Sequence, residues 1–228
     1  MSVRLLSSLK AFFTLKELEA MLEIPYQVIW RYISLKSTPE RATARKIIGK
    51  VEELGLIDRA LERNLIINSR GYVETWRFLN SFNFLELMGY QVTKFVGDEE
   101  IDTVVSYPPS ASPLALVSSD WLRSKACISL DYPDLSVEFY HRASYISHDR
   151  GRILDVYLPG SVIKRGDKVL LVRDVLNNLE SIGAILEILD SIGADLWGVF
   201  SIISVSDEWK ETAAKYGIEK VRVFKEIP

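Results

Sequence analysis

The strongest constraint on the fold is an alternation of short apolar segments and helical spacing that runs from Ser69 onward. The stretch 168–185, "KVLLVRDVLNNLESIGAI", is typical, because four aliphatic residues, Val169 to Val172, precede apolar residues spaced as on one helix face. A continuous aliphatic run of this length predicts a strand buried on both faces. Strands that alternate with helices predict a mostly parallel sheet, so we expect an α/β fold over 69–228.

The other elements of this region follow from the same patterns. Strands are expected in "DTVVSYPP", "ACISLD", "LSVEFYHRASYI", "RILDVYLP", "DLWGVFSIISV" and "VRVFKEI". Helices are expected over 72–88, 111–122, 180–192 and 207–216. Two of the strands alternate polar and apolar residues around the polar segment "SHDRG", which predicts a hairpin.

Composition excludes several classes of protein. Apolar residues make up 48% of the 228, which is enough for a sizeable core. The apolar runs are strand-length and no leader sequence is recognised, so we expect a cytoplasmic protein without a membrane span. The single cysteine, Cys127, excludes an internal disulfide, and with only two histidines beside it no metal site is expected.

Residues 14–33 predict two short helices joined by a tight turn. Thr14 followed by Glu17 is a capping-box pattern, and the helix that it starts is expected to end near Glu23. Pro25 suits the first turn of a second helix. Two helices joined by about three residues form a helix-turn-helix, in which the second helix enters the major groove of DNA.

The second helix has a polar and aromatic face that suits DNA. Glutamine and arginine side chains read base edges, and basic side chains nearby hold phosphates. Residues 1–50 carry a net charge of about +5 and the rest about −8, as expected of a module that meets a polyanion. The expected DNA-contacting residues are Tyr26, Gln27, Trp30, Arg31, Lys36, Arg41 and Arg45. The alternative is a helical hairpin that packs against a partner or caps the body, with Tyr26 and Trp30 buried.

The segment "IPYQVIWRYISLKSTPERA" resembles the helix-turn-helix of archaeal phosphoribosyltransferase-like transcription regulators. The matching positions are Pro25, Arg31, Tyr32, Pro39, Glu40, Arg41 and Ala42. The resemblance implies a helix-turn-helix DNA-binding domain over 1–68, for which a winged arrangement is one of the known forms. One departure is Glu23, at a turn position where glycine is usual because it accepts a left-handed backbone. Helical structure is expected to continue to about Asn64, followed by a strand at "LIIN".

Residues 69–228 resemble type I phosphoribosyltransferases in three features that occur in chain order. "IDTVVSYPPSASPLA" stands where the family has its pyrophosphate loop, and "YHRASYISHDRGRILDVYLPG" is similar to the flexible hairpin that covers the substrate. "GDKVLLVRDVLNNLESIGAI" is similar to the signature "GDxVLIVDDVxxTGGT", which binds phosphoribosyl pyrophosphate. The resemblance implies a mostly parallel twisted sheet flanked by helices, and a ligand from nucleotide metabolism.

The signature is altered where the family's chemistry takes place. The resemblance implies that two acids hold the ribose hydroxyls and that the turn wraps the 5′-phosphate with backbone N–H groups. Here Arg173 replaces the first acid and Asp174 keeps the second. Because a cation opposes an oxocarbenium-like ribosyl centre, we predict that transfer is lost while binding survives. The expected ligand residues are Arg173, Asp174, Asn177, Asn178, Leu179, Glu180 and Ser181, with Ser106, Ser110, Ala111 and Ser112 from the first loop.

The turn itself carries two further expectations. Without glycine, a positive φ is expected only at the asparagines. Leu179 and Glu180 are expected to crowd the phosphate. Alternatively, Asn177 and Glu180 form a capping box, so that the turn only begins a helix.

Three other segments each allow two interpretations or a single bland one. The serine loop over 106–112 suits an anion, or equally a solvent turn. The hairpin carries cations that either close over phosphates or are simply solvated: His141, Arg142, His148, Arg150 and Arg152. The acidic run over 98–102 is expected to be a solvated loop.

These patterns predict a transcription regulator with a DNA-binding domain at 1–68 and an effector-binding domain at 69–228. The effector is expected to be phosphoribosyl pyrophosphate or a related nucleotide or nucleobase, and the partner double-stranded DNA. A homodimer is expected, with the apolar segment 76–90 serving either the interface or the core. Mg²⁺ is expected only together with bound phosphoribosyl pyrophosphate. The alternatives are an active purine- or orotate-type phosphoribosyltransferase with accessory N-terminal helices, and an assembly module without ligand or DNA.

Overall fold

The computed structural model describes residues 1–148 and 150–227, which divide into two compact units. Unit 1 is Met1–Tyr90 and unit 2 is Gln91–Pro228. The boundary between these two units falls between residues 90 and 91, inside the helix Phe82–Val96. The boundary expected at 68/69 instead separates a DNA-binding from an effector-binding domain, and it stays a prediction. In the described part of the chain, no helix combines the length and the apolar character needed to cross a membrane.

Unit 1 is helical. Its helices are α1 (Ser2–Leu9), α2 (Leu15–Leu22), α3 (Tyr26–Ile33), α4 (Arg41–Glu53), α5 (Leu56–Glu62), α6 (Trp76–Leu79) and most of α7 (Phe82–Val96). Each of the first four contributes fully buried aliphatic residues, such as Leu6, Leu18, Ile29 and Ile47. These side chains form a core that is specific to the helical unit.

The junction between α2 and α3 is close to the prediction. Thr14 and Glu17 form the expected capping box, in which Thr14 N donates to Glu17 Oε2 at 2.6 Å and Glu17 N donates to Thr14 Oγ1 at 3.2 Å. Glu23 ends α2 with a φ of 55°, in the left-handed region. Lys50 and Lys46 of α4 lie 3.5 Å and 3.4 Å from its carboxylate, and their charges lower the pKa of Glu23. These contacts hold a non-glycine residue in this turn.

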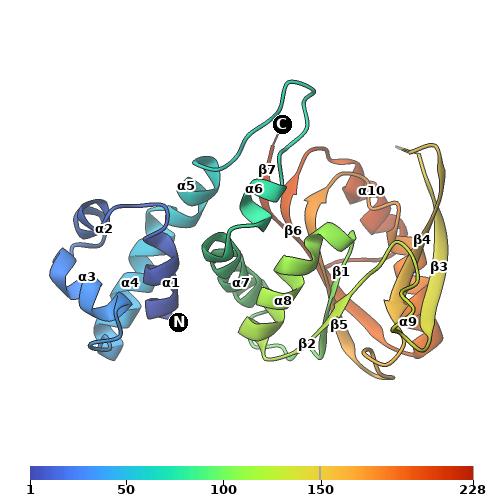
Figure 1. The fold of residues 1–228 in the computed structure, drawn as a ribbon, viewed down its shortest axis with the longest axis horizontal. Helices are drawn as coiled ribbons and strands as arrows, with labels where there is room; N and C mark the ends of the chain where they lie inside the picture. The colour runs from blue at the N-terminus through green and yellow to red at the C-terminus, as the bar shows by residue number, and fades with distance from the viewer. Residues whose placement is uncertain (149, 228) are drawn as a thin grey trace. The chain divides into compact units, whose positions relative to one another are not determined.

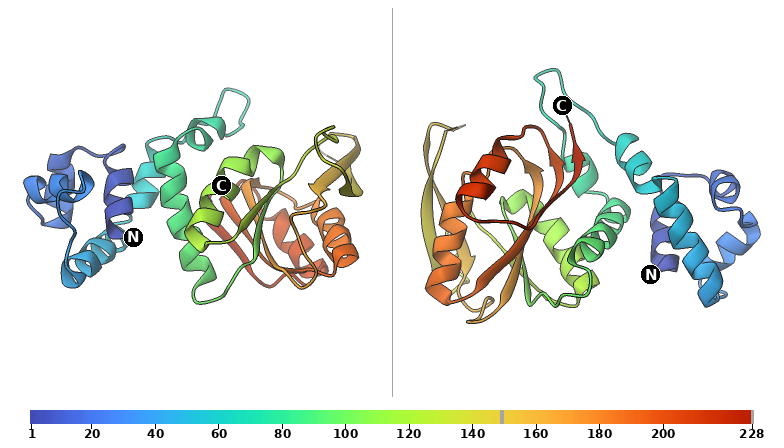
Figure 2. Two further views of the ribbon diagram at one scale, coloured as in Figure 1. Left: turned by 60° about the horizontal axis from the view of Figure 1, so that its bottom comes forward. Right: turned by 180° about the vertical axis from the view of Figure 1, so that it is seen from behind.

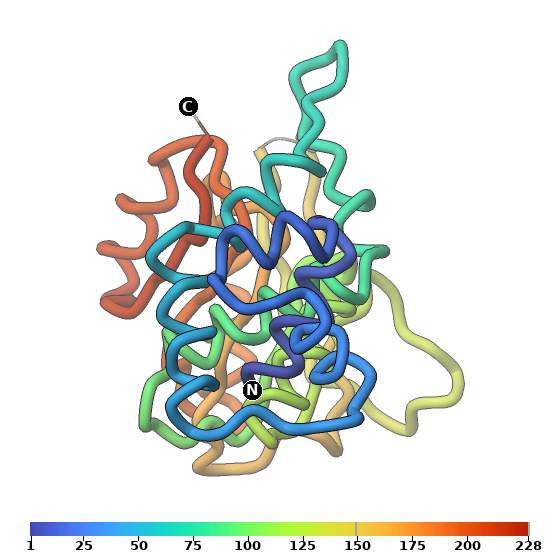
Figure 3. The backbone as a smooth tube through the Cα atoms, turned by 90° about the vertical axis from the view of Figure 1, so that its left-hand side faces the viewer, coloured from blue at the N-terminus to red at the C-terminus, as the bar shows by residue number. Residues whose placement is uncertain are grey.

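The helical structure expected to continue to about Asn64 reaches Glu62, and Gly55, with a φ of 57°, divides it into α4 and α5. Two other expectations for unit 1 were wrong. The helix expected over 72–88 is two helices, α6 and α7. The strand expected at "LIIN" is reduced to one bridge, Ile67 to Val73, within an extended loop (teal in Figure 3).

Unit 2 contains the expected parallel sheet. Its strands are β1 (Thr103–Ser106), β2 (Lys125–Ile128), β5 (Lys168–Leu176), β6 (Asp195–Ser204) and β7 (Val221–Glu226). They lie in the order β2-β1-β5-β6-β7, and every neighbouring pair is parallel. The expected hairpin forms separately from β3 (Tyr140–Ser147) and β4 (Arg152–Pro159), which pair in antiparallel register. The α/β class predicted for this region is confirmed.

Helices flank both faces of this sheet. A short 3₁₀ turn, η1 (Pro109–Ala111), leads into α8 (Ser112–Leu122), which covers one face. On the other face lie α9 (Ile182–Ile192) and α10 (Glu208–Lys215), with the β3–β4 hairpin beside α9 (Figures 1 and 2). Because successive strand residues point to opposite faces, each strand supplies side chains to both layers.

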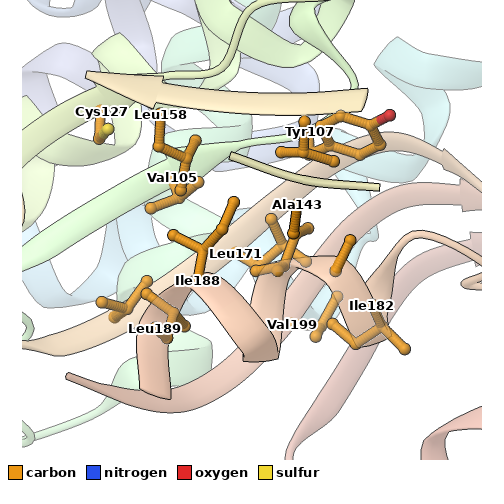
Figure 4. Packing of buried hydrophobic residues seen from close by; sticks show 14 of the residues in the cluster. Val105, Tyr107, Cys127, Ala143, Leu158, Leu171, Ile182, Ile188, Leu189 and Val199 are labelled. Atoms are coloured by element: carbon orange, nitrogen blue, oxygen red, sulfur yellow. The ribbon is translucent and has the colours of Figure 1, made fainter. Parts of the chain in front are cut away.

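The core between the sheet and α9 also includes the hairpin. Its members from the strands, the helix and the hairpin include Val105, Leu171, Val199, Ile182, Ile188, Ala143 and Leu158 (Figure 4). Cys127 is buried in the same cluster, as predicted, and burial raises the pKa of its thiol to about 12. The hairpin is therefore anchored by the buried side chains of Ala143, Val156 and Leu158, whereas Ile146 and Ile153, nearer its tip, are exposed.

Candidate functional site

The topology of unit 2 brings the predicted loops together. Parallel strands end at one edge of a sheet, and ligands of such sheets bind outside these carboxyl ends. β1 and β5 are neighbours, with Ser106 opposite Val172. The loop after β1 (107–112) therefore meets the turn after β5 (177–181), and Ser110 Oγ donates to Asp174 Oδ2 at 2.8 Å across the junction.

A cavity of about 220 Å³ lies between these loops and the hairpin. Six of the predicted ligand residues line it: Arg173, Asp174, Asn177, Asn178, Glu180 and Ser181. The hairpin adds Tyr145, Ser147 and Arg150, and the loop after β1 adds Tyr107 and Pro108. A neighbouring cavity of about 300 Å³ shares Tyr107, Pro108, Tyr145 and Arg150. The fold thus gathers all three sequence features around one hollow, although a role in ligand binding stays a prediction.

Leu179 lies elsewhere than expected. Its side chain is fully buried in the core between the sheet and α9, and it does not line the cavity. Its φ of 55° turns the side chain inward, so the left-handed position falls on a leucine and not on an asparagine. The expectation that Leu179 crowds a phosphate was wrong, because apolar burial draws the side chain away from the hollow.

The serine loop also differs from the prediction. Ser106 Oγ accepts from Ser129 N at 3.3 Å and lies 3.3 Å from Ser112 Oγ, while Ser112 Oγ donates to the carbonyl of Pro109. Ala111 is fully buried. These three residues hold the loop in shape and do not line the cavity, so only Ser110 of the predicted set comes close, through Asp174.

Glu180 ties the hairpin tip to the turn. One carboxylate oxygen, Oε1, accepts from His148 N at 3.0 Å and lies 2.8 Å from His148 Nδ1. Glu180 N donates instead to Asn178 Oδ1 at 3.2 Å, and Ser181 is the N-cap of α9 without a side-chain cap bond. The N-cap of α9 is therefore Ser181 and not Asn177, which contradicts the capping box proposed for Asn177 and Glu180.

Other hairpin cations divide between the cavities and the surface. Arg150 lines both cavities, and Arg152 lines only the larger one. Arg142 is exposed and pairs with Asp155 at 3.0 Å, and His141 packs edge-on against the ring of Phe139. Only part of this basic group is placed where it can meet an anion in the hollow.

Two tyrosines at the site were missed by sequence reasoning. The hydroxyls of Tyr107 and Tyr145 lie 2.8 Å apart, and the Tyr107 ring centroid lies 5.8 Å from the guanidinium carbon of Arg173. Burial, and then the hydrogen bond with Tyr145, raise the pKa of Tyr107, so this phenol stays neutral. The available signal was position alone, because Tyr107 directly follows β1 at the carboxyl edge.

In unit 1, the predicted DNA-contacting residues share one property. All seven are exposed: Tyr26, Gln27, Trp30, Arg31, Lys36, Arg41 and Arg45. Tyr26 and Trp30 are 40% and 43% exposed, and the alternative in which they pack against a partner or the body stays open. Lys36 Nζ lies 4.3 Å from the ring centroid of Trp30. Contact with DNA stays a prediction.

Comparison with known proteins gives a match in structure only. No family model and no curated protein matches this sequence. Adenine phosphoribosyltransferase from Rhodothermus marinus matches with a TM-score of 0.62 at 14% identity, covering 76% of this chain and 99% of that one. The enzyme from Thermoanaerobacter pseudethanolicus matches with a TM-score of 0.63 at 12% identity, covering 75% and 99%.

A larger protein shows the same likeness. UMP synthase from Leishmania donovani matches with a TM-score of 0.54 at 14% identity, covering 84% of this chain and 41% of that one. Identities this low show the fold alone. The chain therefore shares the phosphoribosyltransferase fold over about three quarters of its length, and its activity must be argued from the site.

Proposed function

We propose that unit 2 binds a phosphoribosyl-type ligand in the cavity at the carboxyl edge without transferring it, and that the chain is a DNA-binding transcription regulator controlled by this ligand. The observation that carries the first part is Arg173. Its guanidinium occupies the position of the first acid in the resembled signature and lines the cavity. Catalysis of ribosyl transfer stabilises positive charge on the sugar, and a fixed cation beside it acts in the opposite sense.

The regulator part rests on unit 1. Its second and third helices meet in a three-residue turn, and α3 carries glutamine, arginine and aromatic side chains on an exposed face. Side chains of these types form base contacts and phosphate contacts when a helix lies in the major groove. In a symmetric dimer, two such helices about 34 Å apart meet successive grooves, so a ligand that rotates the subunits changes DNA affinity.

For the DNA contact, Gln27→Ala and Arg31→Ala are each expected to weaken specific binding by about 1–3 kcal/mol. A duplex selected from a random-sequence pool by the wild-type chain serves as the probe in gel-shift titrations. Arg59→Ala is the control, because it removes the same charge from an exposed position on α5. If the two α3 variants bind like the control, α3 does not lie in the groove.

A second candidate function is an active phosphoribosyltransferase. It is favoured by one finding, that the solved structures with this fold named above are enzymes of nucleotide synthesis. Asp174, the second acid of the resembled signature, is also retained. Against it stands the charge reversal at Arg173.

We expect no nucleotide product when the chain is incubated with phosphoribosyl pyrophosphate, Mg²⁺ and adenine, other purines or orotate. Product is followed by chromatography, with an adenine phosphoribosyltransferase run in parallel. Because enzymes typically turn over at about 1–1,000 s⁻¹, a single hour separates an enzyme from a binding protein. Turnover in that range would favour the enzyme and refute the proposal of binding without transfer.

A further inference from the structure

The guanidinium of Arg173 is buried but not fully used. The residue is 8% exposed. Its Nη1 donates to Ser181 Oγ at 3.0 Å and its Nε to the Val175 carbonyl at 3.4 Å. Among residues 1–148 and 150–227, the hydrogen bonds of the guanidinium are those of Nη1 and Nε, which leaves its second terminal nitrogen, Nη2, without an acceptor. Since Arg173 lines the cavity, this group is available to a ligand there.

The charge of Arg173 also has no ion-pair partner among the described residues. The carboxylate of Asp174, whose charge favours the protonated guanidinium, accepts from Val175 N at 2.9 Å and from Ser110 Oγ at 2.8 Å. The Glu180 carboxylate is engaged by His148. Burial lowers the pKa of Arg173, but an arginine keeps its proton in proteins. A desolvated cation without a salt-bridge partner is costly, because burial outweighs the opposing effect of the Asp174 charge, and an anion in the cavity would compensate it.

The rest of the cavity suits a small polar anion. Arg150 supplies a second cation, and Ser147 and Ser181 supply hydroxyls. Asp174 supplies carboxylate oxygens that accept from sugar hydroxyls. A volume of about 220 Å³ lies below the range of roughly 300–1,000 Å³ typical of drug-sized ligands, which points to a molecule such as a sugar phosphate.

The same residues do not fit Mg²⁺. This ion is held by one or two carboxylates together with the phosphates of its substrate. Among the described residues, the carboxylates that line the cavity are those of Asp174 and Glu180, and Arg173 places a positive charge beside them. A divalent cation at this edge would be repelled by the guanidinium.

We propose that the cavity binds a sugar phosphate as the free anion, with its phosphate on Arg173 and Arg150 and without a divalent cation. This inference rests on the proposed ligand-binding role of unit 2 and specifies its ligand class. The replacement of the first acid by Arg173 then serves to bind the phosphate. It exchanges a metal-assisted site for one in which guanidinium groups bind the phosphate directly.

Calorimetric titration with ribose 5-phosphate tests the proposal. We expect saturable binding of equal affinity in EDTA and in Mg²⁺, with ribose not binding and inorganic phosphate binding more weakly. Arg173→Gln is expected to lower the affinity for ribose 5-phosphate by about tenfold or more, because it removes a charged hydrogen bond. Arg142→Gln, the same substitution at the exposed ion pair with Asp155, should leave affinity unchanged.

The outcomes separate this inference from the proposed function. Binding of ribose 5-phosphate or phosphoribosyl pyrophosphate only with Mg²⁺ overturns the inference and leaves the ligand-binding role intact. If neither compound binds in EDTA or in Mg²⁺, the inference and the proposed ligand-binding role are both overturned. Unchanged affinity in Arg173→Gln refutes the anion contact, and inorganic phosphate that binds as tightly as the sugar phosphate refutes the ligand class. If Arg173→Gln does not fold, Arg150→Gln at the hairpin decides, since it too should weaken binding.

Discussion

Leu179→Ala is expected to lower the free energy of unfolding by about 2–5 kcal/mol, the range for truncating a fully buried leucine. The Leu179 side chain has no exposed surface and lies among the aliphatic residues of α9, including Ile182 and Ile185. It is the only apolar side chain by which the turn 177–181 enters this core. Its loss leaves a cavity and frees the turn that forms one wall of the ligand cavity.

Urea denaturation followed by circular dichroism measures this change. Leu135→Ala is the matched control, because Leu135 is completely exposed and the same truncation should cost less than about 0.5 kcal/mol. Leu179→Gly adds a second comparison. A left-handed residue other than glycine costs about 1–2 kcal/mol, so glycine regains part of what it loses in burial. A loss below 1 kcal/mol in Leu179→Ala, a threshold set well under the expected range, would mean that the side chain is not in the core and faces the cavity after all.

The sheet could be predicted because its signal is local. Val169 to Val172 form a continuous aliphatic run, and all four are fully buried in the structure. Parallel strands must end at a common edge, so the meeting of the loops after β1 and β5 follows from the fold class alone. The breaks in unit 1 are different. Gly55 and the junction of α6 and α7 interrupt segments whose apolar spacing continues, and only packing decides where such helices end.

The direction of loop side chains was not predictable from the sequence. Whether Leu179 or an asparagine takes the left-handed position depends on which side chain the core admits, and this is known only once α9 is in place. Ser106 ends β1 and Ser112 begins α8, so these two serines flank the predicted loop, and their hydroxyls are used within the protein. Arg173 was recognisable as a departure from the resembled signature. Its unused Nη2 could be seen only in the structure.

Asp167→Ala is expected to lower the free energy of unfolding by about 3 kcal/mol, because it removes three hydrogen bonds and leaves the buried hydroxyl of Thr103 unpaired. Asp167 Oδ2 accepts three hydrogen bonds, from Thr103 Oγ1 at 2.9 Å, from Lys164 N at 3.0 Å and from Lys125 Nζ at 2.6 Å. Thr103 is fully buried. The cluster lies where β1, β2 and β5 begin, at the edge opposite the cavity. Stability should therefore fall while the affinity of the folded protein for its ligand is kept.

Asp167→Asn is expected to destabilise the fold in a way that depends on pH. Burial raises the pKa of Asp167, but the hydrogen bonds from Lys125, Lys164 N and Thr103 outweigh burial, and the net shift is downward. Because the folded-state pKa lies below that of the unfolded chain, the ionised carboxyl stabilises the fold above the ordinary aspartate pKa of about 3.9. This contribution disappears as pH falls through the folded-state pKa.

Thermal melts of wild type and Asp167→Asn from about pH 7 to about pH 2.5 follow that loss. The difference in Tm should be largest at neutral pH and should shrink at the acidic end, where the wild-type carboxyl is itself protonated. Asp98→Asn is the control, since Asp98 is exposed and should show little difference at any pH. A Tm difference that stays constant down to the lowest pH would show that the asparagine amide destabilises the fold through its geometry. The charge of Asp167 would then not stabilise this edge of the sheet.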